Sequence, residues 1–165
     1  MDLQRIARHL FYAPWRVGLA FPASALKSIE QAIRKSEATH GGEIRFAVEG
    51  ALDGRPLFRG LSARERAIDV FSLLRIWDTA GNNGVLIYLL LADRDVEIVA
   101  DRGLNASVGP QEWEAICHAM EAAFLRSEYE KGVLAGIDAV TRHLARHFPA
   151  SGPNRNELPD RAVVL

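Results

Sequence analysis

Residues 84–92 read GVLIYLLLA, and this almost unbroken apolar run decides the fold. A run of this length is typical of a central strand that is covered on both faces of its sheet. The turn Asp93-Arg94-Asp95 follows at once, and apolar residues at 96, 98 and 100 then alternate with their neighbours. The sequence therefore predicts a buried strand joined by a tight hairpin to a second, more exposed, antiparallel strand.

A further strand is predicted earlier in the chain, at GEIRFAVEG (residues 42–50). Here Ile44, Phe46 and Val48 alternate with mainly charged residues, which indicates one well-buried face. Between this strand and residues 84–92 lies a segment with helical spacing, opened by the capping box of Ser62 and Glu65. A helix between two consecutive strands favours a parallel crossover.

Three more segments show the apolar spacing of helices. They are residues 22–40, 110–124 and 129–144, and two of them begin at a proline. The predicted order is helix, strand, helix, strand, strand, helix, helix. This order predicts an α/β fold with a small mixed sheet and helices on its faces.

The chain divides into three parts: an N-terminal segment (1–21), an α/β domain (22–149) and a C-terminal tail (150–165). In the first part, basic residues lie beside Phe11 and Trp15, so this segment either packs on the core or forms an arm that docks on a membrane surface or partner. In the tail, Pro, Asn and Asp dominate and apolar periodicity stops, which predicts a flexible appendage.

Composition limits the function classes. Of 165 residues, 48% are hydrophobic and 25% charged, the balance of one globular domain. With 20 Lys+Arg against 21 Asp+Glu, the formal net charge is -1. This argues against nucleic-acid binding through positive charge spread over the whole chain. The single cysteine, Cys117, excludes an internal disulfide. No run reaches the ~20 apolar residues of a membrane helix, so we expect no transmembrane segment and a cytoplasmic location.

Together these segments resemble the TPM-domain family, also labelled TPM phosphatase. The resemblance is carried by WDTAGNNGVLIYLLLADRDVEIVADRGL (77–104), by GEIRFAVE (42–49) and by the Phe124-x4-Tyr129-x2-Gly132 pattern, and it spans residues 22–149. It implies a three-layer α/β/α sandwich, divalent-metal (calcium) binding, weak acid phosphatase activity and roles in maintaining membrane protein complexes. Many members carry secretion signals or membrane anchors, whereas this chain resembles a compact bacterial branch with neither.

A candidate site follows from the expected topology. The start of the strand at 84 and the end of the strand at 100 fall at one edge of the sheet, with the start of the first strand beside them. Oxygen-bearing side chains gather in the adjoining loops, and hard cations such as calcium prefer such ligands. The predicted metal ligands are Asp78, Asn82, Asn83, Asp101 and Glu112. Arg102 and a helix N-terminus are expected to hold an anionic group beside them.

Structural explanations exist for the same residues. Asn82-Asn83-Gly84 is also an ordinary turn sequence, and Asp101 is also suited to cap the loop after its strand. Asp78 is equally suited to close its own helix.

Two functions remain open. The first is a metal-supported interaction or assembly module that docks on a protein partner or membrane-associated complex, as a monomer or weak dimer. The second is a weak metal-dependent phosphoesterase, in which Asp78 or Asp101 positions water and Arg102 clamps phosphate.

Overall fold

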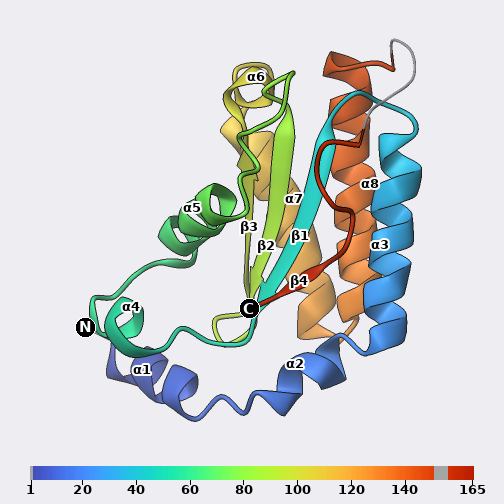
Figure 1. Cartoon of the computed structure of the whole chain (residues 1–165). Helices are drawn as coiled ribbons and strands as arrows, with labels where there is room; N and C mark the ends of the chain where they lie inside the picture. The colour runs from blue at the N-terminus through green and yellow to red at the C-terminus, as the bar shows by residue number, and fades with distance from the viewer. Residues whose placement is uncertain (1, 151–155) are drawn as a thin grey trace.

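Two buried parallel strands form the middle of the sheet, β1 (Glu43–Glu49) and β2 (Gly84–Leu90). The computed structural model describes residues 2–150 and 156–165. β3 (Asp95–Ala100) returns antiparallel to β2 through the expected hairpin. A short fourth strand, β4 (Val163–Val164), pairs in parallel with β1, so the order across the sheet is β3-β2-β1-β4 (Figure 1).

Helices cover both faces of this sheet, as the predicted three-layer α/β/α sandwich requires (Figure 1). One face is packed by α3 (Ala23–Glu37), α7 (Pro110–Leu125) and α8 (Tyr129–His147). The other face is packed by α5 (Ala63–Leu73). Alternation along β1 explains the two cores: Phe46 packs with the first group of helices, whereas its neighbour Ala47 packs with α5. The α/β fold predicted from sequence is confirmed.

Local signals in the sequence set where the main helices begin. The Ser62 hydroxyl accepts a hydrogen bond from the backbone N–H of Glu65 at 3.1 Å, and the Glu65 carboxylate accepts one from the backbone N–H of Ser62 at 2.8 Å. This reciprocal pair satisfies two donors at the start of α5 that would otherwise lack partners. Pro110 occupies the first turn of α7, where a missing N–H costs little.

Four short helices were not predicted. They are α1 (Leu3–Leu10), α2 (Trp15–Ala20), α4 (Gly54–Phe58) and α6 (Arg102–Asn105). In Figure 1, α1 and α2 run below one end of the sheet, and α6 lies at the opposite end.

The N-terminal segment is fixed to the β2–β3 turn by charged contacts. Asp93, at that turn, accepts from Arg5 Nε at 2.9 Å and lies 3.0 Å from the Nε2 atom of His9. The other ring nitrogen of His9 accepts the backbone N–H of Leu52 at 2.9 Å. His9 is only 3% exposed, so the segment is packed on the domain here, which agrees with the first of the two interpretations of this segment.

The C-terminal segment corrects the predicted tail. Residues 156–165 are not a free appendage, because Glu43 accepts the backbone N–H groups of Glu157 and Leu158 at 3.2 and 3.1 Å. The segment then runs beside β1 and forms β4. Its apolar part is too short to produce a periodic signal, and its anchor, Glu43, lies far away in the chain. The remainder of the predicted tail, 151–155, lies outside the described residues.

The outer edge of β3 is covered by side chains. Glu121 of α7 accepts the backbone N–H of Val96 at 3.3 Å. Arg64 of α5 donates to the carbonyl oxygen of Ile98 at 2.6 Å. These contacts occupy backbone groups that an edge strand otherwise leaves open to another strand. None of the helices in the described ranges has the length and apolar character needed to cross a membrane.

Candidate functional site at the edge formed by β1, β2 and β3

The strand register brings the predicted loops together at one edge of the sheet. Glu43 pairs with Gly84, and Val85 pairs with Ala100, so the starts of β1 and β2 adjoin the end of β3. Two further hydrogen bonds extend this contact beyond the strands. Asp101 N–H donates to Gly84 O at 2.9 Å, and Gly103 N–H donates to Asn82 O at 3.0 Å.

Asn83 is buried at this edge, with 4% of its surface exposed. Its side-chain Nδ2 donates to Gly41 O at 2.7 Å, and its backbone N–H donates to the Thr79 hydroxyl at 3.2 Å. Its Oδ1 atom is buried and has no hydrogen-bond partner among the described residues. A buried amide oxygen without a partner is unfavourable, which marks this atom as a candidate ligand.

Asp101 shows the same pattern at the end of β3. Its Oδ1 atom caps α6 by accepting the backbone N–H of Arg102 at 2.7 Å. Its Oδ2 atom is buried and, like the amide oxygen of Asn83, finds no hydrogen-bond partner in the described part of the chain. The capping role and a ligand role are therefore compatible, because they use different oxygens of the carboxylate.

The side chains of Arg102 and Asn82 are hydrogen-bonded to each other. Arg102 donates from Nε and Nη2 to Asn82 Oδ1, at 3.0 and 2.8 Å. Asn82 has a φ of 48°, in the left-handed region that asparagine tolerates better than most residues. Gly103 lets the two loops approach, because a Cβ atom there would lie 2.5 Å from Asn82 O. Arg102, the predicted anion-binding residue, and Asn82, a predicted metal ligand, thus hold the loop of residues 79–83 against α6.

The remaining predicted ligands, Asp78 and Glu112, are both exposed. Asp78 is exposed in the loop after α5. Glu112, on α7, is 3.4 Å from the Nδ1 atom of His143 on α8. Across the residues that the structure describes, no three His, Cys, Asp or Glu side chains form a group that could hold a metal ion. Of the predicted ligands, Asn83 and Asp101 are the two whose buried side-chain oxygens lack a hydrogen-bond partner among the described residues.

A second set of buried charged groups was not predicted as a set from the sequence. Glu37, Glu43, Arg45 and Asp160 are each less than a tenth exposed and lie where the C-terminal segment meets α3 and β1. Burial, with further contributions from Glu43 and Asp160, raises the pKa of Glu37 to about 8. Asp160 accepts from Arg34 Nε at 2.9 Å and from Asn156 Nδ2 at 2.6 Å. No local pattern in the sequence marks these residues, because they meet only through the tertiary fold.

Comparisons with known proteins identify relatives of the chain. A family model described as the TPM domain matches residues 20–143. The NMR structure of the BA42 protein from the psychrophilic bacterium Bizionia argentinensis is 30% identical, with a TM-score of 0.77 over 88% of this chain and 95% of that one.

Two other NMR structures share the fold at 16% identity. One is the N-terminal domain of a P. gingivalis protein, with a TM-score of 0.61 over 86% of this chain and 95% of that one. The other is the N-terminal domain of the cg2496 protein from Corynebacterium glutamicum, with a TM-score of 0.55 over 82% and 80%. A search of curated proteins gave no match. From the family match over most of its length, the chain belongs to the TPM domain family.

Proposed function

We propose that this TPM domain is a divalent-cation-binding interaction module, with calcium as the cation, that docks on a protein partner in an assembly, including assemblies at membranes. The observation that carries the proposal is the pair of buried oxygens, Asn83 Oδ1 and Asp101 Oδ2, without hydrogen-bond partners at the same edge. Carboxylate and amide oxygens are ligands that calcium prefers. Both residues are held by backbone hydrogen bonds between adjoining loops, so their positions are fixed before a cation arrives.

The balance of charge at the edge sets the expected affinity. One carboxylate, one amide and loop carbonyls form a ligand set of low charge, which favours weak binding, with Kd on the order of 10⁻⁴–10⁻³ M. The cation would supply a positive centre that closes the loop of residues 79–83 on the end of β3. This chain's residues would orient that loop, with Arg102 fixing Asn82 and Asn83 tying the loop to Gly41.

Exposed apolar side chains support the docking part of the proposal. Phe11, Trp15 and Leu19 of the N-terminal segment are 86%, 66% and 72% exposed. Arg8 and Arg16 accompany them. Large apolar side chains that gather on one segment are typical of contact surfaces rather than of isolated solvent-facing positions.

The alternative, a metal-dependent phosphoesterase, has less support. It needs Arg102 free to bind phosphate oxygens, whereas both hydrogen bonds of its side chain go to Asn82. It also needs a carboxylate to position water beside the cation, whereas Asp101 already uses its Oδ1 atom to cap α6 and Asp78 is exposed.

Calcium titration by calorimetry tests the proposal. Asp101→Asn is the informative variant, because asparagine also caps helices well and keeps an oxygen for the Arg102 N–H while the charge is removed. Asp78→Asn is the control, since Asp78 is exposed and lies outside the pair of buried oxygens. We expect saturable binding by the wild type and by Asp78→Asn, and at least tenfold weaker binding by Asp101→Asn. Absence of calcium binding by the folded wild type would refute the cation site.

A further inference from the structure

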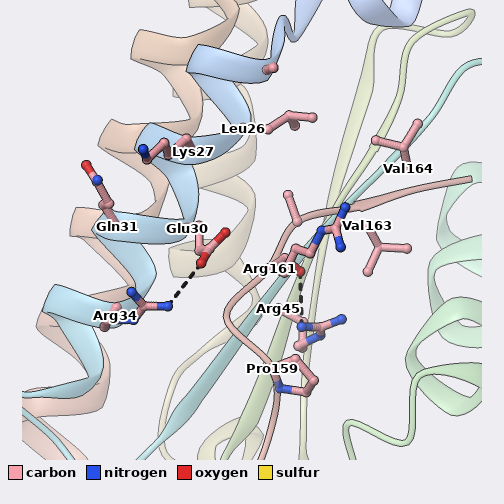
Figure 2. Close-up of a pocket in the computed structure, with 12 residues that line it drawn as sticks. Leu26, Lys27, Glu30, Gln31, Arg34, Arg45, Pro159, Arg161, Val163 and Val164 are labelled. Atoms are coloured by element: carbon pink, nitrogen blue, oxygen red, sulfur yellow. Dashed lines mark hydrogen bonds and ion pairs between the residues drawn. The ribbon is translucent and has the colours of Figure 1, made fainter.

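A groove runs between α3 and the C-terminal segment, away from the candidate cation site. Its volume is about 750 Å³. Figure 2 shows Lys27, Glu30 and Arg34 on the α3 side, facing Arg161 and Val164 of the C-terminal segment. Apolar residues line it between the charges, chiefly Leu26, Ala162 and Val163.

The groove carries an excess of positive charge. Of the described residues that line it, Glu30 is acidic, whereas four are basic: Lys27, Arg34, Arg45 and Arg161. Arg34 is paired with Glu30 at 3.0 Å and with Asp160 at 2.9 Å. Within residues 2–150 and 156–165, Lys27 and Arg161 form no ion pair, and both are exposed. They are therefore available to a negatively charged ligand.

Arg45 adds a fixed cation at the sheet side of the groove. It is 6% exposed, and its Nη1 atom donates to the carbonyl oxygen of Arg161 at 3.1 Å. Its Nε atom is buried and lacks a hydrogen-bond partner in the described residues. A ligand in the groove therefore meets Arg45 through its positive charge, which the Asp160 carboxylate partly offsets, and not through this donor.

The other feature of the groove is an open strand edge. Among the residues that the structure describes, β4 pairs with β1 on one side and with no strand on the other. Leu165 N–H donates to Val48 O at 2.9 Å, so the backbone groups of the preceding residue, Val164, are directed away from β1. Val164 is 52% exposed. The edge of β4 is thus free to accept a further strand, unlike the covered edge of β3.

The length of the groove fits an extended peptide. The α3 residues that line it run from Ala23 to Arg34. This part of the helix rises about 16 Å, which is the length of roughly five residues in an extended strand. A small anion would fill only part of such a groove.

We propose that the groove binds an extended acidic segment of a protein partner, which adds to the edge of β4 and places its carboxylates against Lys27 and Arg161. Strand addition of this kind takes affinity from backbone hydrogen bonds and specificity from alternate side chains. The inference rests on the proposed interaction function and gives it a partner class, but it does not depend on the cation site.

The test uses a fluorescein-labelled peptide, Val-Glu-Val-Glu-Val-Glu, and fluorescence polarisation with the full chain. We expect saturable binding that Lys27→Glu and Arg161→Glu each weaken at least fivefold. Arg161→Glu keeps the backbone carbonyl that Arg45 uses. Lys35→Glu is the matched control, because Lys35 is exposed on the same helix and does not line the groove. This control should change affinity less than twofold.

Two further peptides separate charge from strand addition. Val-Lys-Val-Lys-Val-Lys should not bind, and an acidic peptide N-methylated at alternate residues should lose at least fivefold in affinity. Three results would overturn the inference. They are equal binding of the acidic and basic peptides, a loss of affinity in Lys35→Glu as large as in Lys27→Glu and Arg161→Glu, and no saturable binding of the acidic peptide by the folded protein. Repeating the titration with calcium and with a chelator keeps the two proposals apart, since peptide binding in the chelator supports the groove even if the cation site fails.

Discussion

Replacing Glu37 by glutamine should remove a pH dependence of stability from this protein. Glu37 is 6% exposed, and its Oε1 atom accepts the backbone N–H of Ile44 at 2.8 Å. Burial, opposed in part by this hydrogen bond, raises the pKa of the carboxyl group from the ordinary 4.5 to about 8. Glutamine resembles the protonated acid in shape and keeps both an oxygen acceptor and a donor toward Asp160.

Whether stability rises or falls with pH depends on which state, folded or unfolded, holds the Glu37 proton. Between pH 4.5 and about 8 the folded protein keeps the Glu37 proton, whereas the unfolded chain releases it. Unfolding therefore releases a proton, and the stability that Glu37 contributes is full below pH 4.5 and is lost as the pH rises through 8. One pKa unit corresponds to about 1.4 kcal/mol. The whole increase, from 4.5 to about 8, is thus worth about 5 kcal/mol.

Urea unfolding from pH 5 to pH 9, followed by circular dichroism, measures this effect. The free energy of unfolding of Glu37→Gln, relative to the wild type, should increase by about 3–4 kcal/mol across that range. Taking the difference removes contributions from other groups that titrate in both proteins. Glu30→Gln, on the more exposed side of the same helix, controls for the loss of one carboxylate. Parallel curves for Glu37→Gln and the wild type would show that the folded state does not retain this proton.

Two substitutions test other parts of the fold. Gly103→Ala should lower the free energy of unfolding by about 1–3 kcal/mol, because its Cβ atom would lie 2.5 Å from the Asn82 carbonyl oxygen. Gly109→Ala is the control, because the atom nearest to its Cβ would lie at 3.5 Å. Equal denaturation midpoints for the two variants would contradict the close approach at Gly103. Tyr88→Phe should cost about 1.5–3 kcal/mol in the same assay, since the buried phenol donates to the Glu49 carboxylate at 2.7 Å, and an unchanged midpoint would mean that this hydrogen bond adds nothing.

Periodicity and chain order were enough to predict the centre of the molecule. The apolar run of residues 84–92 and the alternation in residues 42–50 produced two buried strands, and the helix between them made these strands parallel. The capping box at Ser62 located the start of α5. These signals are local or depend on neighbouring elements, so a sequence contains them without tertiary information.

β4 and the N-terminal helices were missed for a common physical reason. A two-residue strand has no period to detect, and it is held by Glu43 and Arg45, which bind the C-terminal segment from more than a hundred residues away. The place of α1 depends likewise on Asp93. A buried charged side chain that serves a distant segment resembles an exposed one in the sequence.

The sequence predicted which loops lie together at this edge, but not the contacts of their side chains. Strand order placed Asn83 and Asp101 at one edge, as the register shows. The pairings of Arg102 with Asn82 and of Glu112 with His143 depend on the rotamers of long side chains, which sequence spacing does not determine. Calcium binding at this edge stays a prediction.

The covered edge of β3 has a consequence for stoichiometry. A strand added at β4 extends the sheet on one side only, because Glu121 and Arg64 already occupy backbone groups on the other side. If a second copy of the chain paired its β4 edge with β4 of the first, a third copy could not pair with β3 of either. Growth by strand addition therefore stops after one step, which protects the protein from forming open-ended filaments through the same edge that we propose for partner binding.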